Sequence, residues 1–260
     1  KRPSGIISKH GAYLTGETFW VPYFDQSPIA FDVQYKIDGS WMVVSQGKMS
    51  GNRVEGETRT MKYSCKNPQH EIYLVAGPWE LFDETYKGVD VQVFLRSSDK
   101  GLANKYIAAT KKYLDIYESM IAPYPYSKFA LLENYWETGY GMPSFTLLGQ
   151  KVIRFPWIIH SSYPHELLHN YWGNGVYVDY DSGNWCEGLT AYMADHLFKE
   201  MKQEGAKYRM ETLKKYTDYV SEHNESLLSD FKSRHSAATE AIGYGKSLMV
   251  FHMLRVRFGK

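Results

Sequence analysis

Short runs in which hydrophobic and polar residues alternate fill the first third of the chain. They are rich in β-branched and aromatic residues and are separated by turn-forming stretches such as DGS (38–40) and SGN (50–52). This pattern is typical of β-strands that bury one face. The clearest predicted strands are FDVQYKI (31–37), WMVVSQG (41–47), EIYLVAG (71–77) and VDVQVFLR (89–96).

The hydrophobic period changes near Gly101. Over residues 102–121 apolar residues recur every three to four positions, with lysines between them, which predicts an amphipathic helix. Two further strands are predicted, FALLENYW (129–136) and FTLLGQKVI (145–153), joined by a glycine-rich turn, and helical patterns dominate the rest. We therefore expect an α+β fold, with a β-rich N-terminal domain over residues 1–97 and a mainly helical domain over residues 98–260.

Composition excludes several classes of protein. The 260 residues suffice for one or two domains, and 30 Lys plus Arg against 29 Asp plus Glu give no electrostatic reason to expect a nucleic-acid partner. No apolar run is long enough to span a membrane. The two cysteines, Cys65 and Cys186, exclude a disulfide scaffold. Aromatic residues make up 16% of the chain, which indicates tyrosine-rich cores or, alternatively, a groove for peptide or carbohydrate.

The stretch SSYPHELLHNYWGN (161–174) contains two histidines around a glutamate. Because successive residues of a helix turn by about 100°, His165 and His169 lie on one face, one turn apart, and both imidazoles can reach one metal ion. Glu166 lies beside that face, where it can hold a water without binding the metal. The alternative is an ordinary helix whose histidines are satisfied by hydrogen bonds.

A third ligand distinguishes these two interpretations, because a catalytic zinc needs three protein ligands and an open position. Glu187 follows His169 after seventeen intervening residues, at the start of a second helical pattern, and Gly183 and Asn184 supply a turn and a cap before it. The intervening segment is long enough to reverse the chain. Two histidines and a carboxylate are the ligand set of zinc hydrolases, although cobalt and manganese also accept these ligands.

These residues resemble a known family. The segments HELLHNYWGN and NWCEGLTAY look like the zinc motif of the aminopeptidase N family of gluzincin metallopeptidases. The resemblance extends to YLVAGPWEL (73–81), YPYSKFALLE (124–133) and YGKSLMVFHMLR (244–255), and more faintly to residues 12–64. It implies a thermolysin-like catalytic domain and one Zn²⁺ per chain. The family usually has eighteen residues between the second histidine and the glutamate, one more than this chain.

The resemblance also implies a mechanism of peptide hydrolysis. His165, His169 and Glu187 would hold Zn²⁺, which lowers the pKa of a bound water and polarises the substrate carbonyl. Glu166 would act as general base and then as general acid. Tyr244, in the segment YGKS, matches the family's catalytic tyrosine and would donate a hydrogen bond to the oxyanion. Without the resemblance, Tyr244 would be an ordinary residue at a helix start.

A glycine-rich strand and turn is expected to bind the substrate backbone. It comprises Gly139, Tyr140, Gly141 and Met142 and continues to Ser144. Glycines let a peptide main chain approach an exposed sheet edge closely, although an ordinary hairpin turn has the same sequence features. Where the family has a glutamate that binds the substrate α-amine, this chain has Pro143. Glu137 is the nearest acid that could replace it.

Five further residues are given structural interpretations. Asp195, eight residues after Glu187, could orient a ligand histidine, but a solvated helix carboxylate is the favoured interpretation. Cys186 is expected to pack in the interior. The remaining histidines of interest, expected to have structural roles, are His160, His196 and His252.

Three functions follow from these expectations. The favoured one is a zinc aminopeptidase acting on peptides, the second is a zinc peptidase that does not require a free N-terminus, and the third is a non-catalytic peptide-binding module. The chain begins with KRPSG and ends soon after a helical pattern, so we expect the natural protein to be longer at both ends. Nothing in the sequence indicates an oligomeric state or a compartment.

Overall fold

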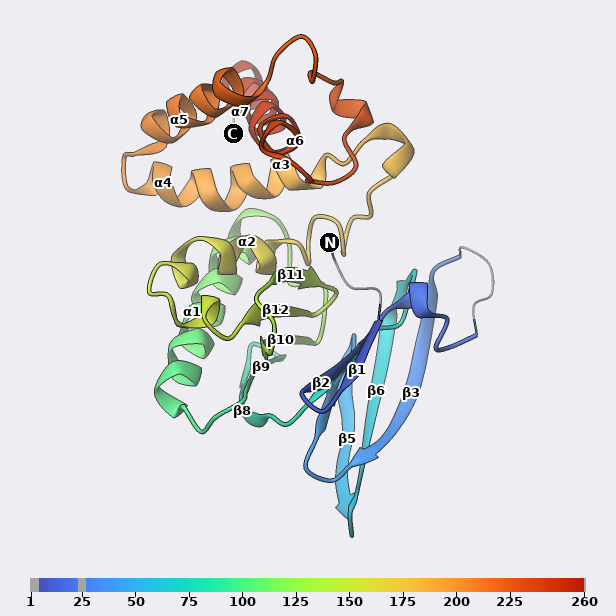
Figure 1. Ribbon diagram of the computed structural model, residues 1–260. Coiled ribbons are helices and arrows are strands. Elements are labelled where there is room, and N and C mark those ends of the chain that lie inside the picture. Colours follow the sequence, from blue (N-terminus) through green and yellow to red (C-terminus); the bar gives the residue numbers. More distant parts are fainter. Residues whose placement is uncertain (1–4, 23–26, 260) are drawn as a thin grey trace. The chain divides into compact units, whose positions relative to one another are not determined.

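The computed structural model describes residues 5–22 and 27–259, and its chain contacts group into two compact units, residues 1–155 and 156–260. The first unit contains sheets and one long helix, and the second is helical (Figure 1). The α+β class is therefore confirmed. Strand β9 before residue 98 and strand β10 after it pair in the same sheet, so this sheet crosses the boundary expected near residue 98. The division of the natural protein into domains at that residue stays a prediction.

Two sheets of the first unit are antiparallel. The four-stranded sheet has the order β1-β2-β7-β4 and the three-stranded sheet has the order β3-β6-β5. The strands are β1 (Gly5–Ser8), β2 (Gly11–Leu14), β3 (Ile29–Asp38), β4 (Met42–Val44), β5 (Lys48–Glu55), β6 (Thr58–Gln69) and β7 (Leu74–Gly77).

The third sheet is mixed and has five strands in the order β11-β12-β10-β9-β8. Strand β10 runs parallel to both of its neighbours, whereas β8 and β11 are antiparallel to theirs. Among the described strands, β11 lies at one edge of this sheet. The strands are β8 (Glu80–Tyr86), β9 (Val89–Leu95), β10 (Lys128–Asn134), β11 (Gly139–Met142) and β12 (Phe145–Gly149).

Helix α1 (Lys100–Met120) supplies the crossover between the parallel strands β9 and β10, and its existence was predicted from the hydrophobic period. The side chain of Asp99 caps it by accepting a hydrogen bond from the Leu102 N–H (2.9 Å). Its buried residues recur at helical spacing, as expected for one apolar stripe: Ala103, Tyr106, Ile107, Thr110, Tyr113, Leu114 and Tyr117.

Two local predictions in the first unit were wrong. The stretch Ser50–Asn52 was expected to be a turn, but it lies inside β5, where the register shifts between Met49 and Gly51. A β-bulge uses the same small and polar residues as a turn. The strand expected over 145–153 ends at Gly149, and Val152–Arg154 forms a 3-10 turn.

The second unit consists of short helices. Figure 1 shows α3 continuing through a π-helical segment into α4 as a single rod. The helices are α2 (Ser162–Leu168), α3 (Cys186–Ala191), the π segment η5 (Tyr192–His196), α4 (Leu197–Met201), α5 (Gly205–Tyr219), α6 (Ala237–Glu240), the π segment η7 (Ala241–Lys246) and α7 (Ser247–Phe258). This unit also has 3-10 turns at Ile158–His160, Tyr180–Ser182 and Leu228–Asp230, and the first unit has a further one at Gly16–Thr18.

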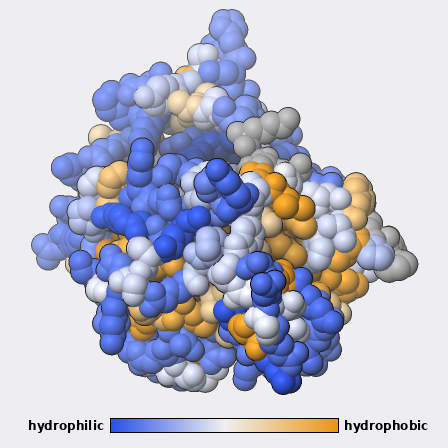
Figure 2. Space-filling view, turned by 60° about the horizontal axis from the view of Figure 1, so that its bottom comes forward, coloured by the Kyte–Doolittle hydropathy of each residue, from blue (hydrophilic) through white to orange (hydrophobic). Residues whose placement is uncertain are grey.

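The face of the molecule seen in Figure 2 is mainly hydrophilic, with hydrophobic areas between the polar ones. None of the helices formed by the described residues has the length and apolar character needed to cross a lipid bilayer.

Candidate metal centre

Helix α2 places the two histidines of the HELLH motif one turn apart. His165 lies in its last turn, and His169 follows the helix in right-handed helical conformation, with its N–H bonded to the His165 carbonyl (3.2 Å). Tyr163, Leu167 and Leu168 are fully buried and hold the remaining faces of the helix in the interior. The imidazole rings of the two histidines are therefore neighbours, with their centroids 4.9 Å apart.

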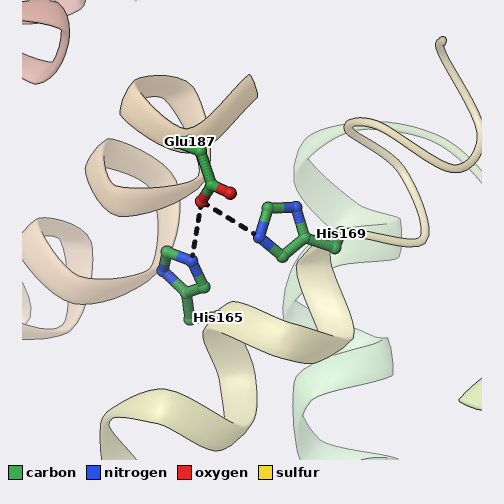
Figure 3. Close-up of side chains that lie close together, drawn as sticks. All are labelled: His165, His169 and Glu187. Atoms are coloured by element: carbon green, nitrogen blue, oxygen red, sulfur yellow. Dashed lines mark ion pairs between the residues drawn. The ribbon is translucent and has the colours of Figure 1, made fainter. Parts of the chain in front are cut away.

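Glu187 reaches this pair from the first turn of α3. Its Oε2 atom lies 3.5 Å from His165 Nε2 and 3.3 Å from His169 Nε2, so one carboxylate oxygen faces both imidazoles (Figure 3). The three potential ligand atoms all lie within 4.8 Å of one another. The side chains are 12%, 12% and 21% exposed, so the cluster is mostly buried without being closed to solvent.

Hydrogen bonds at the other ring nitrogens fix which nitrogen of each histidine carries the proton. His165 Nδ1 lies 2.8 Å from Asp195 Oδ2, and His169 Nδ1 lies 3.1 Å from the Trp172 carbonyl oxygen. A carbonyl only accepts, so His169 Nδ1 must donate, and a carboxylate favours the same tautomer at His165. In the neutral form both Nε2 lone pairs then point toward Glu187. This is the arrangement that metal-binding histidines use.

The donor set fits a zinc ion. Glu187 Oε2 is buried and, among the described residues, has no hydrogen-bond partner, although it lies between two imidazole nitrogens. A buried carboxylate oxygen that accepts no hydrogen bond is unfavourable, and a bound cation would stabilise it. Two imidazole nitrogens and one carboxylate oxygen are the three protein ligands of one class of catalytic zinc sites, which keep a fourth position open.

The pKa values of the two histidines and of Glu187 are shifted by their mutual interactions. Burial lowers the pKa of His165, but Asp195 and Glu187 outweigh this and raise it to about 9. The pKa of His169 is also raised well above its ordinary value, because Cys186 and Glu187 outweigh burial. Burial raises the pKa of Glu187, yet the two histidines hold it well below its usual range. Protons thus take the place of a cation between the same atoms.

Glu166 lies next to the cluster without being part of the ligand set. Burial raises the pKa of its carboxyl group, and the charges of His165 and His169 act in the opposite direction. A carboxylate whose pKa is raised is a stronger proton acceptor than one in water. The role of Glu166 as a general base stays a prediction.

Tyr244 belongs to the π segment η7 and stands beside His165. The two rings are nearly parallel (14°), with centroids 6.3 Å apart. Burial and the nearby Glu187 carboxylate raise the pKa of the phenol, so the hydroxyl stays protonated and can donate. Arg234 and Phe231 contact the same ring, at 5.7 Å and 6.2 Å respectively.

Two glycines permit this close packing of helices. A Cβ atom at Gly188 of α3 would collide with the side chain of Ser247 at the start of α7, and a Cβ atom at Gly243 would collide with the Phe231 ring. Both positions therefore need the smallest residue. Gly188 lets η7 and α7 approach α3, which brings Tyr244 to Glu187.

The second unit thus brings together His165, Glu166, His169, Glu187 and Tyr244, all singled out from the sequence. Asp195 joins them, so its favoured interpretation as a solvated carboxylate was wrong. Sequence reasoning missed the Trp172 carbonyl, because a backbone acceptor leaves no residue signature.

The residues given structural roles behave as expected where the structure describes their contacts. Cys186 is a buried free thiol next to His169. His196 is fully buried, stacks on Tyr192 and accepts a hydrogen bond from Arg209 (2.8 Å). His252 Nδ1 lies 3.0 Å from the Tyr192 hydroxyl.

The expected substrate-binding residues belong to the first unit. Gly139, Tyr140, Gly141 and Met142 form the edge strand β11. Glu137 directs both carboxylate oxygens at backbone N–H groups, of Lys151 (3.0 Å) and Val152 (3.3 Å). This carboxylate therefore holds the loop after β12. The roles of these residues toward a substrate stay predictions.

Comparison with known proteins gives structural but no sequence matches. No family model and no curated protein matches the chain. Solved structures of M1 zinc metallopeptidases are similar in fold. A mutant of a two-domain enzyme bound to L-arginine has a TM-score of 0.78 at 17% identity, covering 100% of this chain and 61% of that one. The enzyme from Deinococcus radiodurans has a TM-score of 0.73 at 16% identity, covering 100% and 61%.

A third structure shows a Deinococcus radiodurans mutant bound to a Tyr-Ser-Ala substrate. Its TM-score is 0.64 at 16% identity, covering 89% of this chain and 53% of that one. The chain thus spans about three fifths of the length of the first two structures. At this identity the likeness concerns the fold.

Proposed function

We propose that this protein is a zinc metallopeptidase that hydrolyses peptide bonds, with His165, His169 and Glu187 as metal ligands on a thermolysin-like domain. One observation carries the proposal. The buried Glu187 Oε2 lies 3.3 Å and 3.5 Å from the two Nε2 atoms, and both Nδ1 atoms are engaged elsewhere. The fold likeness to M1 zinc metallopeptidases supports it.

The zinc ion, when bound, would supply Lewis acidity, which lowers the pKa of water and polarises the substrate carbonyl. The chain's own residues then move protons and stabilise charge. Glu166 accepts a proton from the attacking water and passes it to the leaving amine, a role for which burial raises its proton affinity. Asp195 holds the His165 ring in place and fixes its tautomer.

Tyr244 stabilises the oxyanion. Its pKa is raised, so the phenol remains a hydrogen-bond donor at any pH where the enzyme works. A donor that is already in place when charge develops contributes to rate without reorganisation. The stacking of its ring near His165 and the contact with Phe231 limit its movement.

Aminopeptidase activity is the finer form of the proposal. The resemblance to the aminopeptidase N family supports it, and so does the L-arginine bound to one similar structure, since a free amino acid is the product of such an enzyme. Strand β11 would align the substrate main chain by β-augmentation. Glu137, the nearest acid, would bind the substrate amine in this form of the proposal, and its carboxylate also accepts two backbone hydrogen bonds.

A specific observation favours a second candidate. Pro143 stands where the family has the amine-binding glutamate, and the nearest acid is engaged in a loop. A peptidase without a strict requirement for a free N-terminus is consistent with both facts. The two candidates share the zinc chemistry and differ only in substrate.

Hydrolysis of alanyl and leucyl arylamides, each with a free and with an acetylated amine, tests the proposal and separates the candidates. An aminopeptidase cleaves only the free forms, and the second candidate cleaves both at similar rates. Glu166→Gln should lower kcat by about 10² to 10⁴ at unchanged zinc content, as loss of a general base does. A wild-type protein that binds peptides, binds no zinc and does not hydrolyse the peptides would instead be the non-catalytic binding module.

A further inference from the structure

Lys128, the first residue of β10, is a fully buried lysine. Its Nζ donates to the carbonyl oxygen of Ser144 (3.1 Å) and to the hydroxyl of the same residue (3.0 Å). The ammonium group also lies over the rings of Phe145 (5.5 Å) and Tyr63 (5.9 Å). Within the described part of the chain no carboxylate lies within ion-pair distance of it, and burial lowers its pKa to about 7.

Charged groups are rarely buried without a counter-charge, because desolvation disfavours the charge. The hydrogen bonds of a lysine in this position must therefore offset the unfavourable desolvation of its amine. Among the described residues, both hydrogen bonds that its Nζ atom donates go to Ser144, so the lysine side chain holds this residue.

Ser144 occupies a strained position in the hairpin between β11 and β12. Met142 and Phe145 pair across the hairpin, so Pro143 and Ser144 form its two-residue turn. Ser144 has a φ of +69°, a left-handed conformation that is unfavourable for a residue with a side chain. Proline followed by a residue with positive φ is the pattern of a type II turn, in which glycine is the usual second residue.

Four hydrogen bonds hold Ser144 in this conformation. Its carbonyl oxygen accepts from the Ala130 N–H (3.0 Å) and from Lys128, and its hydroxyl oxygen accepts from the Gly47 N–H (3.0 Å) and from Lys128. Gly47 has a φ of +76°, and a Cβ atom there would lie 2.6 Å from the Cα atom of Cys65. Glycine is therefore required for the chain to pass this close to Cys65 at the point where its N–H reaches Ser144.

We propose that Lys128 is a positioning residue for strand β11, which it fixes through the Pro143–Ser144 turn. The inference rests on the proposed function, in which β11 aligns the substrate main chain. The segment that replaces the family's amine-binding acid thus has a structural anchor of its own. Lys128 acts through Ser144 and touches no substrate.

The test compares Lys128→Met, which keeps a long side chain without donors, with Ser144→Gly, which suits the positive φ but lacks the hydroxyl. Amide hydrogen exchange is measured over residues 139–142, together with kcat and KM for a peptide substrate. Lys128→Met should speed exchange in β11 and raise KM about tenfold at unchanged kcat and zinc content, the pattern expected when only substrate alignment is lost. Ser144→Gly should show the same split with a smaller rise in KM.

Lys105→Met is the matched control, since Lys105 is an exposed lysine of α1. Unchanged exchange in residues 139–142 of Lys128→Met would overturn the inference. Equal acceleration in β9 and β11 would also overturn it, because the lysine would then be a general core residue. If Lys128→Met does not fold, the exchange of β11 in Ser144→Gly decides.

The two proposals fail separately. Faster exchange confined to β11, in a protein without peptidase activity, would refute the proposed function and leave the anchoring role of Lys128 intact. An active enzyme in which Lys128→Met and Ser144→Gly change neither the KM nor the hydrogen exchange of β11 would refute the anchoring role alone.

Discussion

One hydrogen bond at each ring determines the tautomer and the ring orientation of His165 and His169. Each ring uses Nδ1 for a protein acceptor, so each Nε2 faces Glu187. The two acceptors differ, since one is the Asp195 carboxylate and the other is a backbone carbonyl. Only the carboxylate can be removed by substitution, which makes Asp195 the accessible test of the tautomer.

Asp195→Ala should weaken zinc binding by about 10- to 100-fold, as loss of a partner behind a ligand histidine typically does. The reason is that His165 loses its fixed ring orientation and tautomer. Competition with a chelating dye measures the zinc Kd. Asp218→Ala, at an exposed aspartate of α5, is the control and should leave the Kd unchanged. Equal affinities in both variants would show that Asp195 does not orient the ligand.

Tyr244→Phe should lower kcat by about 10²- to 10³-fold with little change in KM, because the phenol is needed only when the oxyanion forms. The ring that stacks near His165 is retained in this variant, so packing is preserved. Steady-state kinetics at matched zinc content measure the effect. A rise in KM at constant kcat would instead place Tyr244 in ground-state binding.

The cluster of the three proposed ligands was predictable from the sequence because a helix fixes the geometry of residues four apart. His165 and His169 needed only this period, and Glu187 needed only a chain reversal of sufficient length. The Asp195 contact was not predictable. In a regular α-helix Asp195 would lie about 80° around the axis from Glu187, and the π turn at Tyr192–His196 removes part of this rotation.

At the scale of elements, two π segments interrupt the helices of the second unit, and each carries a residue of the site. Tyr192–His196 contains Asp195, and Ala241–Lys246 contains Tyr244. Single π turns inside α-helices are frequent at functional sites. Their positions leave no periodic signal, which is why the sequence predicted helices here and not their irregular turns.

The contact of α3 with α7 depends on Gly188. Gly188→Ala should destabilise the protein by about 1–3 kcal/mol, because the added methyl group has no space beside Ser247. Urea unfolding measures the change. Gly188→Ala combined with Ser247→Gly should recover part of the loss.

Gly101→Ala is the control for intrinsic helix propensity. Gly101 lies near the start of α1, where a Cβ atom meets only Asp99 at 3.5 Å, so alanine should be neutral or stabilising there. If Gly188→Ala were equally benign, the close approach of the two helices would be disproved.

The buried Lys128 makes stability depend on pH. Its pKa falls from an ordinary 10.5 to about 7 in the folded protein. Between pH 7 and 9 the unfolded chain therefore binds more protons than the folded one, and the free energy of unfolding should rise with pH. The groups facing the amine are Tyr63, Cys65 and Asp90, and burial raises the pKa of the Cys65 thiol to about 11.

Denaturant unfolding of wild type and Lys128→Met at pH 7, 8 and 9 measures this dependence. As pH rises, the free energy of unfolding of wild type should increase relative to that of Lys128→Met, because only wild type has an amine at this position that loses its proton on folding. A difference independent of pH would mean that Lys128 keeps its ordinary pKa.

For the whole molecule, the class of fold was predictable, and the division into domains near residue 98 stays a prediction. Alternation identified the strands β3, β4, β7, β9, β10 and β12 of the first unit, and the helical period identified α1. No strand was named for β1, β2, β5, β6 or β8. The pairing of β9 with β10 brings strands from both sides of residue 98 into one sheet, and such long-range pairing is not encoded in local pattern. The similarity in fold to M1 zinc metallopeptidases extends over the whole of this chain, and the matched region is about three fifths of the length of those proteins.

Metal binding should stabilise the fold, since the ligands come from α2 and α3 and meet only when the second unit is folded. Zinc at 100 times its Kd should raise the free energy of unfolding by about 2.7 kcal/mol. Thermal unfolding with zinc and with a chelator measures this. Glu187→Ala should abolish the effect, whereas the exposed-site variant Glu211→Ala should keep it. Equal stabilisation of all three proteins would indicate binding elsewhere.

The most direct measurement is a zinc titration of the metal-free protein, followed by hydrolysis of a peptide substrate. Activity should rise linearly and saturate at one zinc per chain, and magnesium should not replace zinc. Glu166→Gln should bind the same single zinc and remain inactive. Hydrolysis that is independent of zinc, or a wild-type protein that binds one zinc and hydrolyses no peptide, would contradict the account.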